Sequence, residues 1–167
     1  MANVAGMSPR ILSTALCALI LAGCQAPVAS PVAADRTPEF FPTVMKANPP
    51  LPFSEAVRVG DMLFLAGQLG TALGTTQVVP GGINAEARQV MENIKAVLER
   101  HGTSLDHAVK CAVFLADMKE WPAFNAVYRE FFKKDFPARS AFGTTGLAFG
   151  ARVEVECIAW IPPATAK

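Results

Sequence analysis

The sequence lacks the basic surplus of a nucleic-acid-binding protein. Its 167 residues carry a formal net charge of +1, and 17% of them are charged. Arg10 is the only charged residue among the first 23, so the rest of the chain has 14 Lys and Arg residues against 14 Asp and Glu residues. Binding along a phosphate backbone requires excess positive charge. We therefore expect no nucleic-acid partner.

Metal ligands are also scarce. The chain has two histidines, His101 and His107, which flank a predicted turn. Neither has a cysteine or a carboxylate neighbour at the spacing of a metal site. We therefore expect no metal.

The chain has four cysteines, and two of them belong to the predicted folded domain. Cys111 and Cys157 each lie in an apolar, strand-like run. An oxidising compartment permits a disulfide, but the two Cα atoms must then lie about 4.4–6.8 Å apart. Buried cysteines often act as small hydrophobic side chains. We favour this second interpretation for both residues.

The N-terminal apolar run is too short to cross a membrane as a helix. Residues 11–21 fall below the roughly 20 residues that a spanning helix needs. The run follows Arg10 and ends in the sequence LAGC at positions 21–24, which resembles the lipobox of bacterial lipoproteins. We expect residues 1–23 to be a signal peptide and Cys24 to receive the lipid. The alternatives are an ordinary signal peptide and a short buried helix with a chance cysteine.

Residues 24–50 follow as a predicted tether. Prolines distributed along this segment prevent a helix and favour an extended spacer. Gln25 follows the acylated position, and in Gram-negative lipoproteins a residue other than Asp there usually directs the protein to the outer membrane. We expect a lipid anchor on the periplasmic side of the cell envelope. Phe40 and Phe41 are candidates to dock on the domain or on an envelope partner.

Residues 51–162 are predicted to form one α+β domain, followed by a tail at 163–167. Apolar residues at helical spacing indicate helices over 83–101 and about 119–133. Because each helix has a single apolar face, the economical arrangement is one sheet with both helices on the same side. Neighbouring subunits would cover the other side. The expected strands cover 54–58, 62–66, 108–115, 139 onward and 152–160, with a possible short strand at 77–79.

The last strand alternates between apolar and charged residues. Its small apolar residues point to one face, whereas Arg152, Glu154 and Glu156 point to the other. The apolar face suits a core. We expect the charged face to bring its two carboxylates onto one polar surface with the guanidinium of Arg139.

Five segments resemble the Rid family, the YjgF-like reactive-intermediate deaminases, in the same order and at the same spacing. The resemblance implies a chorismate-mutase-like subunit and a homotrimer whose sheets close into a central barrel, with ligand sites in the clefts between subunits. It also implies hydrolysis of 2-imino and enamino acids to 2-oxo acids and ammonia, without a cofactor. The segments are PFSEAV at 52–57, Gly67-Gln68, FNAVY at 124–128, PARS at 137–140 and VEVE at 153–156.

The predicted catalytic residues are Arg139 and Glu154. The planar guanidinium of Arg139 can hold a substrate carboxylate with two hydrogen bonds. Glu154 can polarise the attacking water and then pass a proton to the departing ammonia. The predicted substrate-binding residues are Phe53, Ala66, Gly67, Asn125 and Ala141, the last through its backbone N–H.

Three of these positions depart from the family pattern. Deaminases of the family usually have Tyr where this chain has Phe53, Ser where it has Ala66, and often Cys where it has Ala141. The alternative functions are therefore a module that binds small carboxylates without turnover and an envelope interaction protein. Arg139 and Glu154 would then form a structural ion pair.

Overall fold

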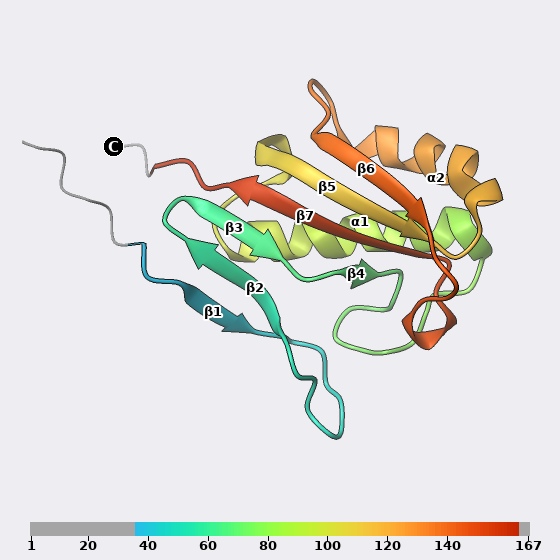
Figure 1. Ribbon diagram of the computed structural model, residues 1–167, viewed down its shortest axis with the longest axis horizontal. Helices are drawn as coiled ribbons and strands as arrows, with labels where there is room; N and C mark the ends of the chain where they lie inside the picture. The colour runs from blue at the N-terminus through green and yellow to red at the C-terminus, as the bar shows by residue number, and fades with distance from the viewer. Residues whose placement is uncertain (1–35, 164–167) are drawn as a thin grey trace, which may run out of the picture. The chain divides into compact units, whose positions relative to one another are not determined.

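The computed structural model describes residues 36–163 (Figure 1). No helix among them is long and apolar enough to cross a membrane. The predicted signal peptide and Cys24 lie outside this range. The strands are β1 (Glu39–Pro42), β2 (Ser54–Val59), β3 (Met62–Leu65), β4 (Gln68–Leu69), β5 (Ala108–Leu115), β6 (Ala138–Gly143) and β7 (Val153–Trp160), and the α-helices are α1 (Gly82–Arg100) and α2 (Trp121–Tyr128).

The strands form one mixed sheet in the order β1-β2-β3-β7-β5-β6, and β4 also pairs with β7. All pairs are antiparallel except β5 with β6. In Figure 1, α1 runs behind the sheet, and apolar residues of both helices and of the central strands share one core. The predicted single sheet with two helices on one face is confirmed.

Burial follows the alternation of β7 that the sequence predicts. Val153, Val155, Cys157 and Ala159 are buried against the helices, whereas the residues between them are partly or fully exposed. Gly102 ends α1 with φ +79°, and the next N–H, that of Thr103, donates to the Leu98 carbonyl at 3.0 Å. Glycine in the left-handed conformation is a common end of an α-helix, and it ends α1 at the end of the helix predicted over 83–101.

The second helix is shorter than predicted. Regular α-helix covers Trp121–Tyr128, with a 3₁₀ turn before it (Met118–Glu120) and another after it (Arg129–Phe131). Asp117 accepts a hydrogen bond from the Lys119 N–H at 2.9 Å and so caps the first turn. Phe132 is extended, which ends the helical segment before residue 133.

The sheet begins inside the segment predicted as a tether. Residues 39–42 form β1, which pairs antiparallel with β2 at the edge of the sheet. Phe41 packs against the core, and its ring centroid lies 4.2 Å from that of His101. Pro42 lacks an N–H donor, and an edge strand tolerates this lack. The possible strand at 77–79 is reduced to a single bridge between Thr71 and Val78.

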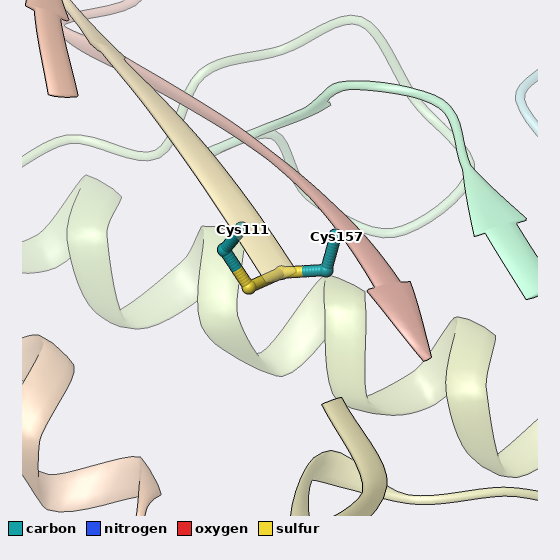
Figure 2. The surroundings of a disulfide bond; sticks show 2 residues. All are labelled: Cys111 and Cys157. Carbon is teal, nitrogen blue, oxygen red and sulfur yellow. A yellow bond between two sulfur atoms is a disulfide. The ribbon is translucent and has the colours of Figure 1, made fainter. Parts of the chain in front are cut away.

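A disulfide joins Cys111 of β5 to Cys157 of β7 (Figure 2). The two residues are directly opposite in the antiparallel register, with their Cα atoms 4.1 Å apart. Both side chains are buried. The expectation of two unpaired hydrophobic cysteines is therefore wrong, because strand register brings together residues that are 46 positions apart in the chain.

Candidate active site

The two predicted catalytic residues lie on opposite faces of the sheet. In the strand register, Arg139 of β6 pairs with Cys111 of β5, and Cys111 pairs with Cys157 of β7. All three side chains therefore lie on the helix-covered face of the sheet. Glu154 precedes the buried Val155 in β7 and therefore points to the open face of the sheet, the face that the helices do not cover. The expectation that Arg139 and Glu154 share one polar surface is wrong within a single subunit.

Glu154 lines a pocket of about 440 Å³ beside β4, whose walls also include Asn93 and Val97 of α1. Three of the predicted substrate-binding residues, Phe53, Ala66 and Gly67, line the same pocket. The structure therefore brings together this part of the predicted site, although the four residues come from three separate segments of the chain. Further apolar walls come from Val44, Met45, Leu51, Leu73 and Phe149.

Gly67 allows the Glu154 carboxylate to lie directly against the backbone beside β4. A Cβ atom at position 67 would lie 1.9 Å from Oε1 of Glu154 and 2.8 Å from its Cδ. Both distances are far inside van der Waals contact, so a larger residue would displace the carboxylate. Gly67 thus sets the position of Glu154 by lacking a side chain.

Burial raises the pKa of the Glu154 carboxyl, and the negative charge of Glu156 raises it further. Within residues 36–163, no hydrogen bond or ion pair holds this carboxylate. A carboxyl with a raised pKa and no fixed partner suits proton transfer, because it can both accept and return a proton.

The carboxylate of Glu55, which is buried, also lines the Glu154 pocket, but its charge is paired. It forms an ion pair with Arg100, and its Oε1 lies 3.3 Å from Nε2 of His101. Glu55 is therefore occupied in a structural contact. In the described part of the chain, no group of three or more His, Cys, Asp or Glu side chains is placed to hold a metal ion.

Arg139 lines a different pocket, of about 230 Å³, at the β6 edge of the sheet. Its guanidinium carbon lies 4.6 Å from the ring centroid of Tyr128 and 5.8 Å from that of Phe124. These cation–π contacts orient the guanidinium. Arg139 forms no ion pair with any residue between 36 and 163, so its charge is available to an anion.

The remaining predicted residues belong to the Arg139 side. Asn125 of α2 lines the same pocket, and Ala141 follows two residues along β6 on the same face, packed against the core. Tyr128 ends the FNAVY motif but is not among the predicted site residues, and it also lines this pocket beneath Arg139. The site residues thus form two groups. The arginine side contains Arg139, Asn125 and Ala141, and the glutamate side contains Glu154, Phe53, Ala66 and Gly67.

Comparison with known proteins shows the family of this chain. The model of the endoribonuclease L-PSP family matches residues 45–161, and the chain belongs to this family. It is 41% identical over 116 residues to a 2-iminobutanoate/2-iminopropanoate deaminase of Dermatophagoides farinae, which covers 70% of this chain and 91% of the relative. The deaminase of Capra hircus is 41% identical over 114 residues, covering 68% and 83%.

Solved structures agree with this assignment. RidA from an Antarctic Psychrobacter species superposes with a TM-score of 0.67 at 35% identity, covering 74% of this chain and 99% of that one. The yjgF gene product of E. coli gives a TM-score of 0.62 at 33% identity, covering 65% and 87%. The resemblance to the Rid and YjgF proteins is confirmed.

Proposed function

We propose that this protein hydrolyses 2-imino and enamino acids to 2-oxo acids and ammonia at sites between subunits of a homotrimer. The observation that carries the proposal is the division of the site. Arg139, which has no ionic partner among residues 36–163, lies on one face of the sheet, and the Glu154 carboxyl, which has a raised pKa, lies on the other. Arg139 can bind a carboxylate and Glu154 can transfer a proton, and only a second subunit can bring both groups to one substrate.

The chemistry requires little beyond positioning and proton transfer. Arg139 holds the substrate carboxylate and so orients the adjacent C=N carbon. Glu154 removes a proton from water as the water oxygen bonds to that carbon, and the C=N electron pair moves to nitrogen. Glu154 returns that proton to nitrogen, which gives a carbinolamine. It then takes the hydroxyl proton and passes it to nitrogen, so that the C=O bond forms as the C–N bond breaks and its electron pair leaves on ammonia. The products are the 2-oxo acid and ammonia.

The open face of the sheet supports a trimer. Phe64 and Phe142 are 42% and 54% exposed, and the ring of Phe142 stacks on that of Phe114 with centroids 6.1 Å apart. Exposed aromatic rings on the face that the helices leave uncovered are candidates for contacts with a second subunit. Packing three such faces together would form the central barrel that the family resemblance implies.

A second candidate function is binding of small carboxylates without turnover. Phe53 and Ala66 line the Glu154 pocket without the hydroxyl groups that family deaminases usually present there. If those hydroxyls position the attacking water, their loss weakens hydrolysis, but Arg139 can still bind a substrate carboxylate. Saturable binding of 2-oxobutyrate without acceleration of imine hydrolysis would favour this second function.

The direct test is an imine-hydrolysis assay on the full-length chain. An amino-acid oxidase generates the imine in situ, and the appearance of ammonia and 2-oxo acid is followed. We expect the wild type to accelerate hydrolysis and Arg139→Ala to abolish the acceleration. Arg88→Ala is the matched control, because Arg88 is an exposed arginine that pairs with Glu130 and lines neither of the two pockets. A wild type indistinguishable from buffer with several amino acids would refute the activity.

Mixed subunits test the division of the site. Arg139→Ala and Glu154→Gln should each inactivate the homotrimer, whereas their co-expression should restore activity. If each site takes Arg139 from one subunit and Glu154 from its neighbour, random mixing of the two variants leaves about a quarter of the sites with both native residues. Recovery of no activity from the mixture would contradict a shared site.

We also propose that Cys24 carries a lipid that anchors the protein on the periplasmic side of the envelope, at the outer membrane in a Gram-negative cell. The Cys111–Cys157 disulfide supports this location, because such bonds persist in oxidising compartments. Cys24→Ser should release the protein from the membrane fraction. Wild-type protein found in the soluble fraction would refute the anchor.

A further inference from the structure

The arginine side of the site contains two buried polar atoms without a partner. They are the Tyr128 hydroxyl and Oδ1 of Asn125, and neither is hydrogen bonded to any residue of the described chain. The two residues are three positions apart on α2 and therefore neighbours on the helix surface. Buried polar atoms are rarely left unpaired, because desolvation without a hydrogen bond is costly. Two such atoms beside one arginine make this pocket a candidate binding site for a polar ligand.

The unpaired atoms and Arg139 have complementary hydrogen-bonding roles. Arg139 offers only donors, Oδ1 of Asn125 only accepts, and the phenol can donate its proton. Burial raises the pKa of Tyr128 to about 12, so the phenol keeps that proton at neutral pH. A ligand that satisfies all three groups needs a carboxylate for the donors and an N–H for the acceptor. A 2-imino acid carries both.

The pocket has room for a ligand of this size. Its volume is about 230 Å³, and Asn125, Tyr128 and Arg139 all line it. Liquid water occupies about 30 Å³ per molecule, so the pocket holds the equivalent of several waters. A small imino acid fits within that space.

We propose that Tyr128 is a further substrate-binding residue, whose hydroxyl donates a hydrogen bond to the carboxylate that Arg139 holds. Asn125 accepts the imine N–H beside it. This inference rests on the proposed function and adds a residue to it. Tyr128 then supplies a hydroxyl to a site in which Phe53 and Ala66 present none.

The test is Tyr128→Phe, which removes the hydroxyl and keeps the ring beneath Arg139. Tyr128 is the only tyrosine of the chain, so the variant removes the single phenol. The first measurement is calorimetric titration of full-length wild type and variant with 2-oxobutyrate, the product that retains the carboxylate. We expect binding to weaken about ten- to a hundredfold, as for the loss of a hydrogen bond to a charged group. The kcat/KM for imine hydrolysis should fall by a similar factor.

Thermal stability without ligand separates binding from a structural role. If the hydroxyl is reserved for the ligand, its removal leaves the melting temperature unchanged or raises it, because an unpaired buried group is lost. A lower melting temperature or a smaller assembly, with unchanged affinity for 2-oxobutyrate, would show that the hydroxyl bonds to protein, and would overturn the inference.

The outcomes for the inference and for the proposed function are distinguishable. Unchanged affinity and turnover in Tyr128→Phe, while Arg139→Ala is inactive, would overturn the role of Tyr128 alone. Binding that depends on Tyr128 without imine turnover in the wild type would support the inference and refute the proposed hydrolysis. A wild type that neither binds 2-oxobutyrate nor hydrolyses imines would overturn both.

Discussion

Reduction of the Cys111–Cys157 disulfide should lower the stability of the domain substantially. The bond joins residues 46 positions apart and thereby restricts the unfolded chain. The loop-entropy relation gives about 4 kcal/mol at 25 °C for a loop of this length. Domains are typically stable by about 5–15 kcal/mol, so the cross-link is a large part of the total.

The assay compares denaturant unfolding of three samples at one protein concentration. They are the oxidised wild type, the wild type reduced during unfolding, and the double variant Cys111→Ala/Cys157→Ala. The first two differ only in the cross-link. The variant also loses two buried sulfur atoms, which we expect to lower its stability by about 1–2 kcal/mol more through lost packing.

The expected order of stability is oxidised wild type, reduced wild type and double variant. The reductant should shift the wild type and leave the variant unchanged. If the curves of oxidised and reduced wild type coincide, the cross-link contributes nothing and the loop-entropy argument fails. If the double variant matches the oxidised wild type, both the cross-link and the packing estimate are refuted.

Three further results follow from the site. Glu154→Gln should abolish turnover. It should also raise the free energy of unfolding at neutral pH, measured with denaturant. The pKa of Glu154 is higher in the folded state than the unfolded value of 4.5, so ionising this carboxyl above pH 4.5 destabilises the folded state, and the amide of Gln does not ionise. Gly67→Ala should lower kcat/KM by about a hundredfold while the far-UV spectrum stays native, because the new Cβ displaces the Glu154 carboxylate; unchanged kinetics would contradict this. The free energy of unfolding of the wild type should fall by up to about 3 kcal/mol between pH 10 and pH 12, because Tyr128 ionises in the unfolded state while the folded state keeps it protonated. Tyr128→Phe should not show this fall.

Local patterns in the sequence were enough to predict most of the fold. Alternation over residues 152–160 predicts which side chains of β7 are buried, and Gly102 marks the end of α1. Family motifs also identify Phe53, Ala66 and Gly67, which line one pocket with Glu154. Each of these features depends on neighbouring residues or on a motif of known spacing.

Features that depend on pairing between distant strands were not predicted. The face on which Arg139 lies is set by the parallel register of β6 on β5, and a shift of one residue would reverse it. The disulfide depends in the same way on the register of β5 and β7. The aromatic spacing of α2 predicts that Tyr128 is buried, but it carries no information about the partner of its hydroxyl.

The place of β7 in the sheet sets the order in which the domain can fold. It is the last strand of the described chain, yet it lies between β3 and β5 and also pairs with β4 (Figure 1). The sheet cannot close until β7 has been synthesised, and contacts so distant in sequence form slowly. In a chain exported as proposed above, this delay would keep the polypeptide unfolded, and so competent for translocation, until nearly all of it has left the ribosome.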